Sequence, residues 1–309
     1  MFSPGTCQFD PDFPPLQGDL VLNSSKLTRL FSTAAVVGAL ATPALAQEEE
    51  GIFIPGASAE VTLDYVSQYF FRGYEQTDSD QGVVIQPGAS FTIDVVEDVT
   101  ATVGTWGSIH SDTPGAGQNP TSWYEQDVYG SLDATFGDFS AGVGLTYYTY
   151  PSSATNGDII ELNLAVGYDD SELFGDFAFA PYVALAYEIQ NNVGADENAY
   201  LEIGGEFALS TEGTAIEAWS WSVPFAIGLS VDDYYTDAGG SDETFGFASI
   251  GLSGSIPLSE LIGTDEYFGA WDLGVGVTFL FLNDDVALTD ATSSDEFQVY
   301  ATVGISRSW

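Results

Sequence analysis

The sequence predicts an all-β fold: a transmembrane, antiparallel, up-and-down β-barrel of about 12 strands behind a cleaved signal peptide. Three observations lead to this prediction. Apolar and polar residues alternate with a period of two along most of the chain, and tight connections alternate with long ones. Beyond the leader, no stretch reaches the roughly 18 consecutive apolar residues that a membrane helix requires.

The composition excludes several classes of function. The 309 residues include 46 Asp or Glu and only 4 Lys or Arg, for a net charge of −42. Such a chain lacks the basic surface that nucleic-acid binding requires. With 45% hydrophobic and 14% aromatic residues it has enough apolar surface to fold. The single cysteine, Cys7, excludes disulfide frameworks and cysteine-based metal sites, and we expect no cofactor.

The N-terminal region predicts export. Residues 25–46 combine a short basic region (Lys26 and Arg29), an apolar stretch and the small-residue signal Ala44-Leu45-Ala46. These features are typical of a signal peptide that is cleaved after Ala46. We interpret residues 1–24 as an over-extended start or a disordered leader, residues 47–57 as a short N-terminal segment, and residues 58–309 as the barrel. The expected location is the outer membrane of a Gram-negative-type bacterium.

Period-two alternation is clearest near the C-terminus. There Val299, Ala301 and Val303 alternate with Tyr300 and Thr302. The same pattern predicts twelve strands, near 58–72, 82–95, 99–111, 122–136, 138–151, 157–169, 176–190, 198–210, 219–232, 242–255, 269–282 and 295–309. An even number suits a bacterial single-chain barrel, whose two termini lie on the same side of the membrane.

The connections also fit a barrel. Those around Glu97-Asp98 and Gly137-Asp138 are tight, whereas 112–122 and 283–295 are long and rich in Gly, Asp, Asn, Ser and Thr. Short turns on one side and long loops on the other are the outer-membrane pattern. Two connections on the short side, near 210–218 and 256–268, are longer than this pattern prefers.

A secreted β-sandwich is the alternative fold, because alternation alone does not distinguish it from a barrel. The membrane is favoured by aromatic residues toward the ends of the apolar faces, where interfacial girdles form: Tyr147, Trp219, Trp221, Trp271, Phe281 and Trp309. The apolar faces of the clearest segments also lack charge. The exception is Arg307, which lies two residues from the terminus and can reach the interface.

The chain ends with a pattern that resembles the C-terminal insertion signal of bacterial outer-membrane proteins. Trp309 shares a face with Ile305, Val303 and Ala301, and Arg307 departs from the signal because an apolar residue is commoner there. This resemblance implies two partners, the lipid of the outer membrane and the barrel-assembly machinery.

A family resemblance is more specific. The segment VSQYFFRGYEQT (66–77) resembles the opening strand of the TorF-type porins, in which a Tyr-aromatic-Phe-Arg-Gly core precedes a Gln-Thr pair. Similar segments follow in the same order: TWGS at 105–108, WYEQDVYG at 123–130 and YYTYP at 147–151. Gln68 stands where Asp is more usual. The resemblance covers about 58–170 and implies an outer-membrane barrel assigned as a porin.

In a barrel, the face opposite the lipid lines the lumen. The alternation places eleven acids there: Glu60, Asp64, Asp94, Glu125, Asp127, Asp133, Glu161, Glu188, Glu202, Glu206 and Asp272. Arg72 opposes them if Tyr69 and Phe71 face lipid. Carboxylate rings favour cations, so the expected function is passive passage of small cationic or neutral solutes. The alternative for these acids is a solvated face. Side chains such as Trp106, Tyr148 and Tyr182, or loop residues, could also plug the lumen.

Two other functions remain open from the sequence. His110 is the only histidine and lies near Ser108, Ser111 and Asp112, so an outer-membrane hydrolase could be assembled there. A non-conducting surface barrel is the second, because the acidic loops 191–198 and 231–243 offer oxygen ligands for Ca²⁺ or an adhesive surface. EF-hand spacing is absent from these loops. We expect no enzyme and no metal site.

Overall fold

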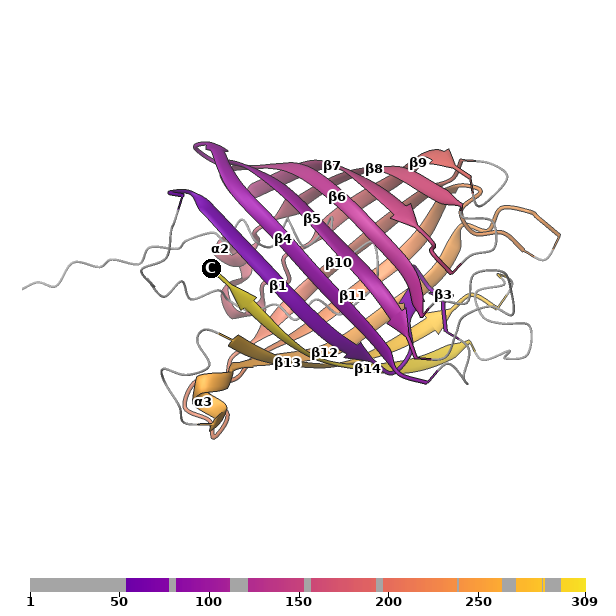
Figure 1. The fold of residues 1–309 in the computed structure, drawn as a ribbon. Coiled ribbons are helices and arrows are strands. Elements are labelled where there is room, and N and C mark those ends of the chain that lie inside the picture. Colours follow the sequence, from indigo (N-terminus) through magenta and orange to yellow (C-terminus); the bar gives the residue numbers. More distant parts are fainter. Residues whose placement is uncertain are drawn as a thin grey trace, which may run out of the picture.

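The computed structural model describes residues 54–77, 82–111, 122–152, 157–192, 197–237, 239–262, 271–284, 286 and 296–309. These residues form one closed barrel of tilted strands (Figure 1). The predicted signal peptide and the predicted leader at 1–24 lie outside the described residues. Within the described part, no helix is both long and apolar enough to cross a membrane.

Twelve long strands make the barrel. They are β1 (Ala57–Val66), β4 (Val84–Val96), β5 (Val99–His110), β6 (Trp123–Phe136), β7 (Phe139–Thr149), β8 (Asp158–Tyr168), β9 (Tyr182–Asn191), β10 (Ala199–Leu209), β11 (Ser220–Asp232), β12 (Phe245–Pro257), β13 (Trp271–Leu282) and β14 (Phe297–Ser308). The prediction of an antiparallel barrel with about twelve strands is confirmed.

Every long strand pairs antiparallel with its neighbour along the chain, and β1 closes the ring by pairing with β14. At this seam Glu60 lies opposite Ser308 and Asp64 opposite Gly304. The backbone N–H and C=O of Trp309 exchange hydrogen bonds with those of Ala59, at 2.9 and 3.1 Å. The start of β1 and the end of β14 therefore lie at the same end of the barrel, which we call the terminal end.

Two connections at the terminal end are tight, and the other three are longer. Glu97-Asp98 and Gly137-Asp138 each join two strands directly, and the residues Asp98 and Gly137 adopt positive φ. The helices α2 (Ser171–Phe174) and η1 (Gly175–Phe177) lie between β8 and β9, and α3 (Leu258–Ile262) follows β12 (Figure 1). The connection between β10 and β11, at 210–219, is also long and holds no helix. The opposite end, called the loop end, carries the connection between β1 and β4.

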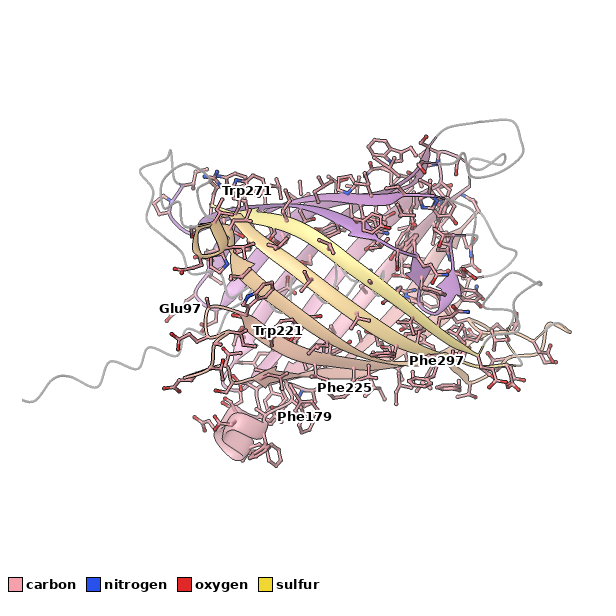
Figure 2. All side chains as sticks on the ribbon, turned by 90° about the horizontal axis from the view of Figure 1, so that it is seen from below. Glu97, Phe179, Trp221, Phe225, Trp271 and Phe297 are labelled. Carbon is pink, nitrogen blue, oxygen red and sulfur yellow. The ribbon has the colours of Figure 1, made fainter. Side chains whose placement is uncertain are left out.

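The two faces of the barrel wall differ sharply in polarity. Outward side chains are apolar and exposed, as Val143, Leu164 and Val303 illustrate, whereas the inward ones between them include the buried Thr146, Asn163 and Thr302. A soluble protein has the opposite arrangement, with apolar side chains inside. Aromatic residues lie near both ends: Trp221 and Trp271 near the terminal end and Phe297 near the loop end (Figure 2).

Arg307 lies on the outer face between two aromatic rings. Its guanidinium carbon is 4.8 Å from the ring centre of Trp309 and 5.9 Å from that of Trp271. Cation–π contacts of this kind let a cation sit at the level of an aromatic girdle. The one charge on the predicted apolar faces is therefore held at the edge of the apolar band.

Two predicted strand boundaries are wrong. The first segment was expected to continue to residue 72, but β1 ends at Val66 and the chain then turns into a separate two-stranded hairpin. The seventh was expected to begin at 176, but α2 and η1 fill that region and β9 begins at Tyr182. The Asp170 carboxylate accepts hydrogen bonds from the backbone N–H of Phe179 and Ala180, which fixes the non-strand path.

Candidate functional site: a hairpin inserted in the lumen

Residues 67–77 form a compact hairpin, here called the inserted hairpin. Its strands are β2 (Phe70–Phe71) and β3 (Tyr74–Glu75), with Phe70 opposite Glu75 and Phe71 opposite Tyr74. Arg72 and Gly73 make the turn, at φ values of 50° and 84°. Two consecutive positive φ values are typical of the tight turns that suit twisted hairpins. The Thr77 hydroxyl closes the base by accepting a hydrogen bond from the backbone N–H of Tyr69 at 3.0 Å.

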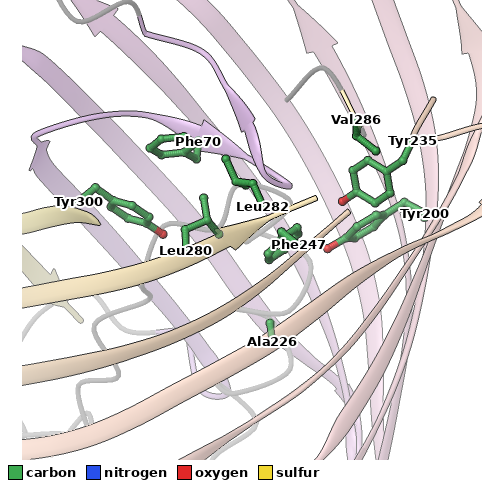
Figure 3. Packing of buried hydrophobic residues seen from close by; sticks show 10 residues of the cluster. Phe70, Tyr200, Ala226, Tyr235, Phe247, Leu280, Leu282, Val286 and Tyr300 are labelled. Atoms are coloured by element: carbon green, nitrogen blue, oxygen red, sulfur yellow. The ribbon is translucent and has the colours of Figure 1, made fainter. Parts of the chain in front are cut away.

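The inserted hairpin lies inside the barrel, because it contacts inward side chains of strands on different sides of the ring. The Tyr69 hydroxyl donates to Glu125 of β6 at 2.7 Å. The ring centre of Phe70 lies 5.6 Å from that of Tyr300 on β14, and Phe70 belongs to a buried cluster with Phe247 and Leu280 (Figure 3). A Cβ on Gly73 would lie 3.0 Å from the ring of Phe247. The hairpin therefore occupies the lumen toward the loop end.

Arg72 is held at the tip of this hairpin by a two-pronged ion pair with β8. Its Nη1 and Nη2 donate to Oε2 and Oε1 of Glu161 at 2.7 and 2.8 Å. The guanidinium carbon lies 4.4 Å from the ring centre of Tyr200 and 5.4 Å from that of Tyr234, and Nη1 donates to the Tyr234 hydroxyl at 3.3 Å. The Tyr148 hydroxyl donates to Glu161 at 3.1 Å. We call Glu161, Tyr148, Tyr200 and Tyr234 the Arg72 site.

The electrostatics of the Arg72 site depend on burial. Arg72 and Glu161 are 3% and 2% exposed, and Glu161 lies directly opposite Glu188 in the β8–β9 register. Arg72 lies in a connection rather than a membrane-spanning strand. Burial alone would lower its pKa, but the Glu161 carboxylate together with Tyr234 and Tyr148 raises the pKa well above the usual range. Arg72 is therefore a permanent cation.

The loop after β11 covers the inserted hairpin. The Tyr235 hydroxyl donates to the backbone carbonyl of Arg72 at 2.8 Å, and the Tyr74 hydroxyl donates to that of Tyr234 at 2.9 Å. On the other side of the hairpin, the Tyr124 hydroxyl donates to the side-chain oxygen of Gln76 at 2.6 Å. Hydrogen bonds from this one loop and from strands of the wall thus fix one docked position.

The structure places the predicted lumen acids in different surroundings. Glu125, Asp127, Asp133, Glu161 and Glu188 are buried on the inward face, toward the hairpin or beneath it. Glu60, Asp64, Glu202, Glu206 and Asp272 are half-buried on the inward-facing positions of their strands. Asp94 is exposed at the terminal end beside Gly56, whose carbonyl accepts a hydrogen bond from its backbone N–H at 2.7 Å. The acids therefore form no single ring.

The surroundings expected for Arg72 need correction. Tyr69 and Phe71 were expected to face lipid, but Tyr69 is buried against Glu125 and Trp106, and Phe71 contacts the ring of Tyr148. The physical reason is that the alternation ends at Val66, so the period-two rule no longer assigns faces beyond it. Arg72 is in the lumen, but on the inserted hairpin rather than on the wall.

Sequence reasoning missed the aromatic half of the Arg72 site. Tyr148 was named only as a side chain that could plug the lumen, and Tyr200 and Tyr234 were not considered. Tyr200 shares its inward face with Glu202, whose carboxylate accepts a hydrogen bond from the Tyr200 hydroxyl at 2.5 Å, so the alternation could have found it. The pair Tyr234-Tyr235 lies in a loop and carries no periodic signal.

Ser108 and His110 are the residues on which a hydrolase would depend. They are hydrogen-bonded, with Ser108 Oγ 3.0 Å from His110 Nε2, and both are 0% exposed. The His110 ring stacks on Tyr124 with ring centres 4.5 Å apart. A nucleophile must reach its substrate, and this hydroxyl is enclosed in the wall. Asp112, the predicted acid partner, lies outside the described residues.

The acidic loop at 231–243 is organised by its own backbone. Asp237 accepts hydrogen bonds from the backbone N–H groups of Ser241 and Gly239, both at 2.8 Å. These bonds, that of Ser241 first, lower the pKa of Asp237. No three His, Cys, Asp or Glu side chains among the described residues are grouped so that they could hold a metal ion. In loop 191–198, residues 193–196 lie outside the described residues.

Solved structures resemble this chain in general barrel architecture. An outer-membrane channel from Pseudomonas putida F1 has 10% identity and a TM-score of 0.47, covering 85% of this chain and 100% of that one. The NanC porin has 8% identity and a TM-score of 0.44, covering 80% and 98%. The translocator domain of the autotransporter NalP from Neisseria meningitidis has 10% identity and a TM-score of 0.39, covering 91% and 94%. At these values the likeness carries no argument about function.

Sequence comparison assigns the family. No curated protein matches the chain. A family model described as "Bacterial protein of unknown function (Gcw_chp)" matches residues 55–238, a range that includes the inserted hairpin and all four residues of the Arg72 site. Because the match covers more than half of the chain, the protein belongs to the Gcw_chp family of bacterial proteins.

Proposed function

We propose that this protein is an outer-membrane channel for passive passage of small solutes, with a preference for cations. The observation that carries the proposal is the inverted polarity of a closed barrel, with an apolar exposed exterior and a polar, acidic interior. An exterior of this kind suits lipid, and a polar interior suits a water-filled or plugged lumen. The exposed aromatic residues near both ends of the wall support the same placement.

The preference for cations is supported by the charges that the lumen presents. Glu125, Asp127 and Glu188 lie on β6 and β9 around a single described inward cation, Arg72, whose charge is matched by Glu161. Carboxylates that line a constriction favour cations over anions. Glu206 is the clearest case, because its carboxylate is only half-buried on the inward face of β10 and so stays in contact with water.

The assignment to the TorF-type porins belongs with this proposal. The segment that carries the resemblance, residues 66–77, contains the inserted hairpin, including Arg72 and the hydrogen-bonded Thr77. We expect such a segment to set the constriction of the channel, and we expect export by a cleaved signal peptide and insertion by the barrel-assembly machinery.

The test is the reversal potential of the purified protein in a planar bilayer under a salt gradient. We expect cation selectivity, and Glu206→Gln should lower the ratio of cation to anion permeability about fivefold, since one unit charge at 4 Å is worth about 1 kcal/mol in water. Asp94→Asn is the matched control, because Asp94 is exposed at the terminal end. Anion selectivity in the wild-type protein would contradict the proposed preference.

A non-conducting surface barrel is the second candidate, and the inserted hairpin favours it. The hairpin and its buried neighbours Phe247 and Tyr235 fill part of the lumen. The same bilayer experiment decides between the two functions. A protein that inserts stably but carries no current over a range of voltages would support the surface barrel and exclude the channel.

A further inference from the structure

The Arg72 site is built by the barrel wall and one loop rather than by the hairpin that fills it. Glu161 and Tyr148 lie on the paired strands β8 and β7, and Tyr200 lies on β10. Strand pairing fixes these three positions, with Tyr148 opposite Ile159 and Tyr200 opposite Ala186. Tyr234 completes the site from the loop after β11. Three of the four residues are therefore positioned by the wall independently of the hairpin, and Arg72 is the group that occupies the site.

The chemistry of this wall matches one class of cation. Two carboxylate oxygens of Glu161 meet two N–H groups of a planar guanidinium in parallel, at 2.7 and 2.8 Å. This fork geometry suits guanidinium and is not reproduced by the compact charge of an ammonium or an alkali ion. The rings of Tyr200 and Tyr234 lie within the distance at which aromatic faces attract cations.

The docked position of Arg72 has two energetic costs. The backbone of Arg72 has a φ of 50°, a left-handed conformation that is uncommon for residues other than glycine. Its Nε is buried and has no hydrogen-bond partner in the described part of the chain. Backbone strain and an unsatisfied buried donor both oppose the docked state. A free guanidinium ion would not bear the backbone cost at this site.

We propose that the Arg72 site is a receptor for guanidinium-bearing solutes, and that Arg72 is a tethered ligand which such solutes displace. The inference rests on the proposed function, because a solute reaches this site only through the lumen. It names the substrate class: small organic cations with a guanidinium group. In the docked state the hairpin closes the site, and competition by a free solute releases it.

The test measures binding rather than conduction. Arg72→Ala protein in detergent micelles is titrated with guanidinium chloride at low, non-denaturing concentrations, and binding is followed by calorimetry against sodium chloride of equal ionic strength. We expect guanidinium to bind Arg72→Ala at least about tenfold more tightly than wild type, because in wild type the site is free in only a small fraction of molecules.

A double variant gives the matched control. Glu161→Gln added to Arg72→Ala removes the carboxylate and preserves the shape of the side chain, so guanidinium binding should be lost. If Arg72→Ala folds poorly alone, its refolding yield with guanidinium chloride is compared with the yield in sodium chloride, and only guanidinium should restore it. Equal effects of the two salts in both assays would overturn the proposal.

The outcomes separate this inference from the proposed function. A barrel that binds guanidinium in micelles but never carries current would contradict the channel and leave the receptor intact. A barrel that conducts, while Arg72→Ala shows no preference for guanidinium over sodium, would contradict the receptor alone.

Discussion

Glu161→Gln is expected to release the inserted hairpin from the lumen. The substitution leaves Arg72, which is 3% exposed, without the carboxylate that matches its charge. Removing one partner of a buried ion pair typically costs about 3–5 kcal/mol. The hairpin is a connection at the loop end, so it can escape this cost by moving Arg72 into water. A cost of about 3 kcal/mol corresponds to a shift of roughly two orders of magnitude in the docked-to-released ratio.

Thiol labelling measures this release directly. Thr77 is buried at the base of the hairpin, and a Thr77→Cys substitution would add the only thiol after Cys7. Its reaction with a polar maleimide should be slow in the parent and much faster with Glu161→Gln. Glu188→Gln is the matched control, since Glu188 faces Glu161 across the strand pair but accepts hydrogen bonds from Asn191 and Asn198 instead of Arg72. Unchanged labelling with Glu161→Gln would show that the ion pair does not hold the hairpin.

Leu164→Arg is the second substitution with a large expected effect. Leu164 is an exposed outward residue of β8, opposite Val143 and Leu185 on the neighbouring strands. In a bilayer, arginine near the midplane costs about 2–4 kcal/mol and arginine near the interface about 0–1 kcal/mol. Phe139→Arg is the matched control, because Phe139 is also exposed but begins β7 at the terminal end.

The measurement is the free energy of unfolding of the reconstituted barrel by urea titration in lipid vesicles. A clear difference between the two arginine variants is the result expected of a membrane-spanning wall. In a soluble protein, an exposed leucine tolerates arginine with a change within about 0.5 kcal/mol. Near-equal, small effects at both positions would therefore contradict the membrane placement.

The sequence predicts the barrel well because a strand is recognised from the alternation of residues that are neighbours in the chain. Alternation such as that of Leu164 and Val166 with Asn163 and Ala165 depends only on neighbours along one strand, and the structure has these residues outside and inside as expected. The predicted strand boundaries are wrong where the alternation ends. In the aromatic run Tyr69-Phe70-Phe71, every side chain is apolar, so the pattern assigns no face, and the Arg72-Gly73 turn is visible only afterwards.

The candidate site could be predicted only in part. The alternation places Glu161 and Glu125 in the lumen, but it does not identify their partners. Arg72 binds Glu161 from 89 residues away in the chain, and Tyr69 binds Glu125 from 56 residues away. Such contacts depend on how far the hairpin folds back and which wall it meets. The alternation of polar and apolar residues along a strand carries no information on either point. It also does not link Tyr234, in the loop after β11, to Arg72 in the inserted hairpin.

The seam between β1 and β14 has a consequence for biogenesis. β1 pairs with β4 on one edge, but its other edge pairs only with β14, since Glu60 lies opposite Ser308 and Ala59 bonds to Trp309. Until β14 is in place, β1 has an open hydrogen-bonding edge, which is a surface that can pair with strands of other chains. Closure of the ring thus depends on β14, and a chain without this strand would leave the edges of β1 and β13 unpaired and open to pairing with other chains.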